Sequence, residues 1–525
     1  MKRSRWLGLI AAGLGAGAGL RLETASAAGS QLVFARVKDA VDLDPAVATD
    51  GLSLNVTSLI LRGLVVFKPG TFDVIPAVAQ SWKASADGKT WTFLLRPNLR
   101  FSDGTPVDAE AVKFNFDRWR LTDNPYRGNF QFSYYESQFS GFPGVIADVR
   151  TNGSRQVTFQ LTHPMGMLLR NLAMPSFALG SPAAIKADIV GFDHKPVGNG
   201  PYLLQEWIRD DHITLTANPR WSPAPAYATV IVRDIPDQAT SVLEIEKGDI
   251  DGLSDLRPDD ARGLQRRTGI TVYRQPSNNN SYLAMNMDKK PFEDVRVRRA
   301  IAYALDVQAI VQAFYGQGGV IANEWNPPGM LGHNPALKAY PRDVGRAKAL
   351  LAQAGLRAGF STQLYFGTAP RPYMPEPQRI AEAIQADLKA VGINVTLAPF
   401  EWGVFLQKIK NGEHPMCLIG WTGDNGDPDN FLYPLLDKDS AVKGGQNYSF
   451  WRDEGFHRLM VAGQSTVDER KRGEIYAKAQ ALVHDQVPAI PLVHTTVPFA
   501  MKSNIVGVIP RPDSALNFEL MRPNR

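Results

Sequence analysis

Three aspartates stand in the segment 420–431, directly after the apolar run 416–421. The run has the composition of a buried strand, and the segment after it carries Asp424, Asp427 and Asp429 beside the indole of Trp421. An apolar wall with a few charged groups is the usual composition of a small-molecule pocket. The segment therefore predicts a site for a solute that carries a positive charge.

A second loop holds one arginine between two prolines. Arg371 lies in an Ala-Pro-Arg-Pro-Tyr stretch that ends at Tyr373. The prolines stiffen the backbone, and a guanidinium offers a carboxylate two parallel donors, which a lysine cannot do. Tyr373, Trp402 and Trp421 lie close to these loops, where aromatic faces suit a pocket for varied side chains. On chemistry alone, a solvated arginine and core aromatics remain alternatives.

The aspartates also have structural interpretations. Asp427 precedes Pro428, which is the pattern of a helix N-cap followed by proline in the first turn. Asp424 fits an ordinary turn equally well. A calcium loop is excluded, because Gly426 is misplaced and position twelve is Leu435 rather than glutamate.

Enzyme motifs are missing from the sequence. The eight histidines include no His-Glu-x-x-His pattern, and neither a Gly-x-Ser-x-Gly nor a phosphate-loop pattern occurs. Paired aspartates of a hydrolase stay open as a weaker alternative. We therefore expect a binding protein without catalytic residues, cofactor or metal.

Alternating helices and strands in the second half position these loops. Strands are expected over 361–366, 393–397 and 416–421, and helices over 343–355, 380–391 and 402–409. Such alternation predicts a mainly parallel sheet, whose ligands bind at the carboxyl ends of the strands. Arg371 and Asp424 both follow such ends.

The first half has weaker periodicity. A strand is expected over 90–95, a helix capped by Asp108, and a dense turn over 195–202 before another strand. The aromatic, glycine-rich stretch 126–144 is expected to be a loop or part of a lobe surface.

The N-terminus has the three parts of a secretory signal peptide. Basic residues precede an apolar run that ends in small residues near Ala27 and Ala28. Removing residues 1–28, which carry a net charge of +3, leaves +2 of the formal +5. The remainder has no long basic run, so nucleic acid is a poor partner. Cys417 is the single cysteine, which excludes an intrachain disulfide. We expect a periplasmic protein of two or three domains.

Several motifs resemble one known family. They are Gln80–Phe93, Phe101–Gly104, Asp108–Val112, Pro196–Tyr202, Arg296–Ile301, Arg371–Tyr373, Glu401–Gly403 and Gly420–Phe431. Over nearly the whole mature length the chain resembles the family 5 extracellular solute-binding proteins of ABC importers, most closely their dipeptide-binding members.

This resemblance implies an α/β fold of two lobes, the periplasmic binding protein fold of the large peptide-binding class. Lobe I would comprise 29–283 and 498–525 with an extra subdomain near 70–190, and lobe II would comprise 284–497. The chain would cross between lobes near 284–286 and 495–498.

The resemblance also implies residue roles. Asp424 would bind the α-ammonium of a dipeptide and Arg371 its α-carboxylate, while the loop at Gly51 on lobe I would face the ligand. Membrane permease subunits would recognise the closed, monomeric carrier. Longer peptides, glutathione, haem or nickel remain alternative ligands. Where dipeptide binders have paired cysteines, this chain has Lys438 and Arg452, which puts the rigidity of that region in doubt.

Overall fold

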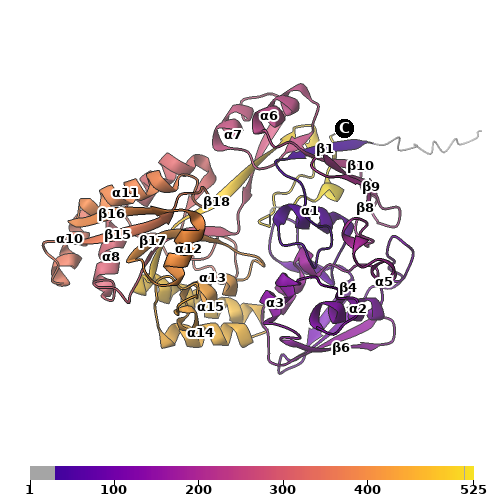
Figure 1. Ribbon diagram of the computed structural model, residues 1–525, viewed down its shortest axis with the longest axis horizontal. Coiled ribbons are helices and arrows are strands. Elements are labelled where there is room, and N and C mark those ends of the chain that lie inside the picture. The colour runs from indigo at the N-terminus through magenta and orange to yellow at the C-terminus, as the bar shows by residue number, and fades with distance from the viewer. Residues whose placement is uncertain (1–29, 514, 525) are drawn as a thin grey trace, which may run out of the picture.

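The computed structural model describes residues 30–513 and 515–524, which form a two-lobed α/β protein (Figure 1). The predicted signal segment, residues 1–28, lies outside the described residues. In the view of Figure 1, the indigo and magenta first lobe lies to the right of the orange second lobe, and the long yellow strand β18 (Ala489–Lys502) runs between them. No helix within the described ranges is long and apolar enough to cross a membrane.

One sheet runs through both lobes. Its strand order is β16-β15-β17-β13-β18-β11-β1-β10-β9-β8, and β12 and β14 also pair with β18. Residues 489–493 of β18 pair with β13 (Asn279–Met285) in the second lobe, whereas residues 496–502 pair with β12 (Ile270–Pro276) in the first. The two chain crossings therefore lie side by side, and β13 runs without a break through the predicted boundary at residue 283.

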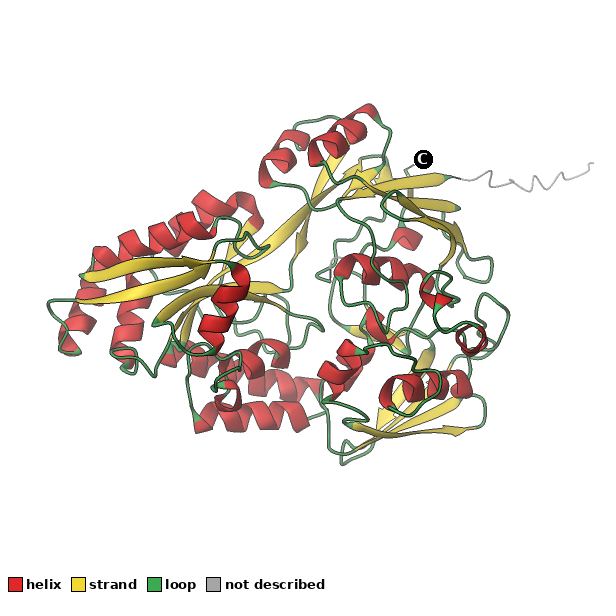
Figure 2. Ribbon diagram, viewed as in Figure 1, coloured by secondary structure: helices red, strands yellow, loops and turns green. Residues whose placement is uncertain are grey.

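The first lobe contains the N-terminal half and the C-terminal end of the chain. A separate four-stranded antiparallel sheet, β4-β5-β7-β6, forms its lower part (Figure 2). The other strands of this lobe are β1 (Gln31–Arg36), β2 (Val65–Phe67), β3 (Val74–Pro76), β8 (Tyr202–Ile208), β9 (His212–Ala217), β10 (Thr229–Asp234), β11 (Gly252–Leu253), β19 (Ile505–Val506) and β20 (Arg522–Pro523). The four-stranded sheet consists of β4 (Ala79–Ala84), β5 (Thr90–Leu95), β6 (Ile146–Asn152) and β7 (Gln156–Leu161). The helices are α1 (Gly51–Ile60), α2 (Ala109–Arg120), α3 (Ser133–Phe139), α4 (Leu168–Leu172), α5 (Pro182–Ala187), α6 (Gln238–Lys247) and α7 (Pro258–Leu264).

The second lobe corrects the prediction of a mainly parallel sheet. Only β16-β15-β17 run parallel, while β13 pairs antiparallel with both β17 and β18. The strands are β14 (Gly319–Ile321), β15 (Phe360–Gly367), β16 (Ile393–Phe400) and β17 (Met416–Thr422). The helices are α8 (Val295–Ala304), α9 (Val307–Ile310), α10 (Val344–Gln353), α11 (Pro377–Lys389), α12 (Trp402–Lys410), α13 (Asp429–Leu436), α14 (Glu454–Ser465) and α15 (Glu469–Gln486). The predicted alternation of helices and strands is confirmed for β15, β16 and β17, but β13 and β18 join the sheet antiparallel from distant segments of the chain.

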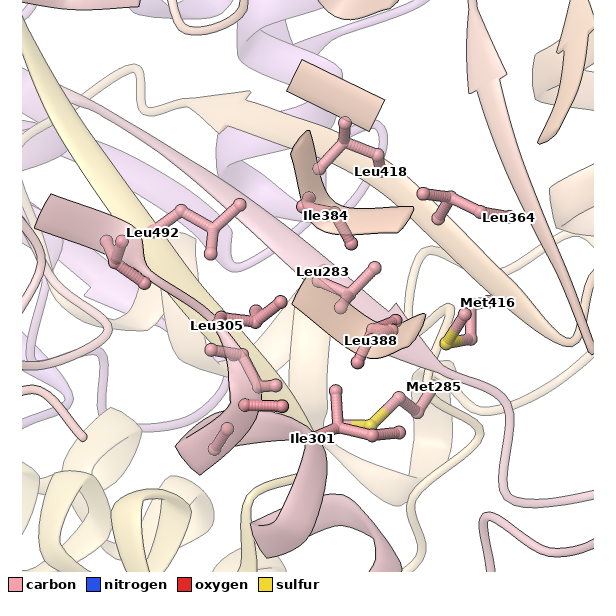
Figure 3. Close-up of a cluster of buried hydrophobic side chains, with 14 of the residues drawn as sticks. Leu283, Met285, Ile301, Leu305, Leu364, Ile384, Leu388, Met416, Leu418 and Leu492 are labelled. Atoms are coloured by element: carbon pink, nitrogen blue, oxygen red, sulfur yellow. The ribbon is translucent and has the colours of Figure 1, made fainter. Parts of the chain in front are cut away.

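The core of the second lobe lies between this sheet and the helices α8, α10 and α11. Leu283, Leu364 and Leu418 project from three neighbouring strands towards Ile384 of α11 (Figure 3). All of these side chains are almost completely buried. Burial of apolar surface stabilises a fold by about 25 cal/mol per Å². The loops at the strand ends are therefore attached to a well-packed sheet.

Local predictions in the first lobe have mixed outcomes. The strand at 90–95 is confirmed, and the Asp108 side chain accepts a hydrogen bond from Ala111 N, so it caps α2 as expected. The prediction that 126–144 is a loop is wrong in part, because α3 forms there. Tyr135 and Phe139 of this helix are buried in the first lobe's core, and this tertiary packing supports a short helix that has no side-chain cap.

Candidate ligand-binding cleft

The two predicted charges follow neighbouring parallel strands. Leu364 of β15 pairs with Met416 of β17, and the two strands continue in register towards their carboxyl ends. Arg371 lies four residues after the end of β15, and Asp424 lies two residues after the end of β17. The structure therefore brings both loops to the same edge of the second lobe's sheet.

Glycine at position 420 allows the arginine loop to lie against β17. A Cβ at Gly420 would stand 2.3 Å from Cδ2 of Tyr373 and 2.4 Å from the carbonyl oxygen of Asn280. Tyr373 is 8% exposed. The backbone carbonyl oxygen of Tyr373 accepts a hydrogen bond of 2.9 Å from the Tyr315 hydroxyl. Burial raises the pKa of Tyr373 to about 12, so its hydroxyl stays protonated at neutral pH.

The guanidinium of Arg371 rests on an aromatic face. Its Cζ lies 3.8 Å from the centroid of the Trp402 ring, and Trp402 in turn packs where a Cβ at Gly367 would stand 2.7 Å from its Cε3. The buried Nε of Arg371 has no hydrogen-bond partner, and no ion pair to Arg371 occurs among the described residues. Trp402 thus holds the arginine in place without neutralising it.

Asp424 is a half-buried carboxylate without a cationic partner among the described residues. Its Oδ2 accepts a long bond of 3.4 Å from Asn430 Nδ2, and its backbone N–H donates to Asn430 Oδ1 at 3.2 Å. The Trp421 indole N–H also donates to Asn430 Oδ1, at 3.2 Å. Burial raises the pKa of Asp424, and the described part of the chain offers it no ion pair. A partly desolvated carboxylate without a counter-charge is unfavourable, which marks this position as a candidate for a cationic ligand.

The first lobe faces this carboxylate through a tyrosine that the sequence did not predict. Burial, followed by the negative charges of Asp424 and Asp50, raises the pKa of Tyr134 to about 12. Tyr134 lies on α3, in the stretch expected to be a loop. Asp50 caps α1 by accepting from Ser53 N at 2.9 Å. These effects indicate that Tyr134 of the first lobe lies near Asp424 of the second.

Gly51 and Arg371 line two adjoining cavities. Gly51 borders a cavity of about 240 Å³ in the first lobe, and Arg371 borders one of about 460 Å³ where the lobes meet. Asp255 and Val497 line both. A Cβ at Gly51 would meet no atom within 4 Å, so its cavity wall is open. Asp424, by contrast, lines neither cavity.

Because α13 begins at Asp429 with Pro428 at its N-cap position and without a side-chain cap, Asp427 is not the helix cap that the sequence predicted. Its Oδ1 accepts from Asp429 N at 3.0 Å, but the carboxylate is fully buried and also pairs with both terminal nitrogens of Arg472, at 2.8 and 2.9 Å. Burial alone would raise the pKa of Asp427, and the charge of Arg472 lowers it instead. No local pattern predicts this pair, since its members are 45 positions apart.

The same loop contacts the first lobe. Asn425 Nδ2 donates to Asn171 Oδ1 at 2.7 Å, and Arg170 Nε lies 3.5 Å from Asp427 Oδ2. A Cβ at Gly426 would stand 2.1 Å from the Phe72 ring. The aspartate segment is therefore held between buried residues of both lobes.

Charged contacts hold the segment around Lys438 and Arg452, the two positions at which the family resemblance implies paired cysteines. Arg452 pairs with Asp288 at 2.7 Å and donates to the Ala441 carbonyl oxygen at 3.0 Å. Lys438 lies 3.2 Å from Glu454. These contacts tie the segment after α13 to the strand region without a covalent link.

Comparison with known proteins places this geometry in a family. The model of the bacterial extracellular solute-binding proteins, family 5 (middle part), matches residues 73–442. The chain belongs to this family. A dipeptide-binding protein of Escherichia coli K12 is 35% identical over 508 residues, covering 94% of this chain and 95% of the relative. A heme-binding protein A of Haemophilus influenzae is 29% identical over 503 residues, covering 93% and 92%.

Solved structures share the fold of this family 5 protein. HbpA2 of Haemophilus parasuis superposes with a TM-score of 0.89 at 30% identity, over 94% of this chain and all of that chain (100%). The periplasmic binding protein DppA of Helicobacter pylori, in complex with the peptide STSA, gives 0.73 at 31% identity over 95% and 98%. These matches confirm the predicted two-lobed fold.

Proposed function

We propose that this family 5 protein is the periplasmic substrate-binding component of an ABC importer and captures dipeptides between its lobes. The observation that carries the proposal is the pair of uncompensated charges, Asp424 and Arg371, at one edge of one sheet. A dipeptide is a zwitterion whose ends lie about 7 Å apart when extended. Its ammonium would pair with Asp424 and its carboxylate with Arg371.

Two fixed opposite charges select ligand length. A ligand that reaches only one of them leaves the other charge unpaired in a site from which closure removes water, and this is strongly penalised. The first lobe would complete the site through Tyr134 and the open wall at Gly51. Trp421 and Tyr373 would line the space between the charges without selecting a side chain.

The relatives support this substrate class. Besides the Escherichia coli protein, a dipeptide binding protein of Pseudoalteromonas sp. SM9913 in complex with Met-Leu superposes with a TM-score of 0.72 at 30% identity. Its TM-score is lower than that of HbpA2 at the same identity and coverage. Ligand-driven closure would give the permease a distinct shape to recognise.

The proposal includes location and organisation. Export through a cleaved signal peptide would deliver a monomeric carrier to the periplasm. We keep lobe I as 29–283 with 498–525 and lobe II as 284–497, and we assign no catalytic residue, cofactor or nucleic-acid partner.

Calorimetry with alanyl-alanine tests the proposal. We expect saturable binding at one site per chain, and loss of binding both for N-acetyl-alanyl-alanine and for the C-terminal amide. Mass spectrometry of the recovered ligand checks the hydrolase alternative, for which free alanine would be the sign. Equal affinity for the free and the N-acetylated peptide would refute the assignment of Asp424.

Haem is the second candidate, because a heme-binding protein A and HbpA2 are among the similar proteins. Haem carries two anionic propionates, which the unpaired carboxylate of Asp424 would repel. We therefore expect titration with hemin to give no stoichiometric change in its Soret band, and no competition with alanyl-alanine. A one-to-one spectral change with peptide displacement would favour haem.

A further inference from the structure

The cavity beside Arg371 carries more positive charge than one carboxylate requires. Its lining includes Arg262, Arg274 and Arg371 against a single acidic residue, Asp255. Both lobes contribute, since Arg262 belongs to α7 and Arg274 to β12 of the first lobe, while Arg371 belongs to the second. An anion in this cavity would meet a formal excess of two positive charges.

Arg274 lacks a carboxylate partner. Among the described residues its side chain has one hydrogen bond, from Nη2 to Oε1 of Gln317 at 2.8 Å, and no ion pair. Because Gln317 belongs to the second lobe, this bond spans the junction. A neutral amide leaves the guanidinium charge uncompensated, and a bidentate carboxylate is the ligand that its planar group fits best.

Arg262 adds charge at the rim. Within the described ranges its one ion pair is with Asp259 of the same helix, whose side chain is 84% exposed, and exposed pairs of this kind contribute little to stability. The opposite wall is the loop at Gly316, whose φ of +53° disfavours other residues. A Cβ there would stand 3.9 Å from Arg262 Nη1. Glycine thus leaves space in front of the guanidinium.

The second side chain of a bound dipeptide would reach this cavity. This side chain branches from the carbon next to the α-carboxylate. If the carboxylate pairs with Arg371, the side chain therefore starts beside the cavity that Arg371 lines. The cavity volume of about 460 Å³ accommodates a long side chain.

We propose that Arg274 and Arg262 form an anion subsite beside Arg371, and that the protein favours dipeptides whose second residue is acidic. This inference rests on the proposed function, because it takes the orientation of the dipeptide from it. The subsite adds a substrate class to that function: peptides that end in aspartate or glutamate.

Calorimetry with two isosteric pairs tests the inference. Ala-Glu should bind about tenfold more tightly than Ala-Gln, the order expected from one charge-assisted hydrogen bond. Glu-Ala, which carries its acidic side chain at the Asp424 end, should show no advantage over Gln-Ala. The Ala-Glu advantage should shrink as salt rises, since partly exposed charges are screened.

Variants assign the effect to residues. In R274Q the Ala-Glu to Ala-Gln affinity ratio should fall to near one, and in R262Q it should fall part of the way. R266Q is the matched control, because Arg266 is exposed and does not line the cavity. The melting temperature of each variant establishes that it is folded.

The outcomes separate the two proposals. Tight binding of both Ala-Gln and Ala-Glu with equal affinity overturns the subsite and leaves the dipeptide function intact. The subsite is also overturned if the ratio persists in the double variant R262Q/R274Q. No binding of any of the four peptides overturns the proposed function, and the subsite with it.

Discussion

Replacing Asp424 by asparagine should weaken ligand binding and stabilise the empty protein at the same time. The carboxylate is half-buried, accepts a 3.4 Å bond from Asn430, and has no cationic partner among the described residues. Asparagine has nearly the same shape and keeps an oxygen for that bond. The substitution D424N therefore removes the charge and leaves the packing unchanged.

The effect on binding follows from the lost ion pair. Truncating one partner of a desolvated, hydrogen-bonded charge pair costs about 2–5 kcal/mol. At about 1.4 kcal/mol per tenfold change, the dissociation constant for alanyl-alanine should rise roughly 30- to 4,000-fold. N-acetyl-alanyl-alanine, which has no ammonium group, should bind D424N and wild type equally poorly.

The effect on stability has the opposite sign. Burial raises the pKa of Asp424 above its unfolded value, so the folded state binds the proton more tightly than the unfolded state. Ionised Asp424 therefore destabilises the empty protein at neutral pH, and this cost disappears as pH falls through the folded pKa. D424N should melt higher than wild type at pH 7, with a difference that narrows in acid.

Calorimetry and thermal melting of the ligand-free protein measure the two effects. D123N, at an exposed aspartate, is the control and should change neither. If D424N binds alanyl-alanine with wild-type affinity, Asp424 is not in the site. If it melts lower than wild type at pH 7, the carboxylate is compensated and the electrostatic argument fails.

Three further predictions concern the supports of the site. G420A should cost about 1–3 kcal/mol of stability and weaken peptide binding, because its Cβ would stand 2.3 Å from the Tyr373 ring. Urea unfolding measures the loss of stability. The control G263A, at a glycine with open space around it, should be nearly neutral. R472M should cost about 3–5 kcal/mol, because it removes both short bonds to the fully buried Asp427 and leaves only Arg170 at 3.5 Å. R470M, at an exposed site, should not have this cost. Equal unfolding midpoints of R472M and wild type would contradict the argument. Burial lowers the pKa of His494 to about 4 from 6.5, so the neutral imidazole contributes stability that is lost as pH falls from 6.5 to 4. The free-energy difference of unfolding between wild type and H494Q should change by about 1.4 kcal/mol per pH unit in that window. A pH-independent difference would contradict the argument.

Local signals in the sequence were reliable where neighbours decide the structure. Asp108 caps α2 because its side chain needs only the amide of Ala111, and the 90–95 strand follows from alternation in six residues. The loops that carry Arg371 and Asp424 were located from turn and proline signals directly after apolar strands. The prediction for 126–144 failed because the packing of Tyr135 and Phe139 into a distant core supports α3.

The sequence by itself determined the residue types, the order of the elements in the second lobe and the family to which the motifs point. The tertiary structure decided which charges remain unpaired: Asp427 finds Arg472 45 positions away, whereas Asp424 and Arg371 find no ion pair among the described residues. It also brought Arg274 and Arg262 to the cavity of Arg371. Whether two charged side chains form an ion pair depends on their distance in the folded protein. The spacing of the two residues along the chain carries no information about that distance.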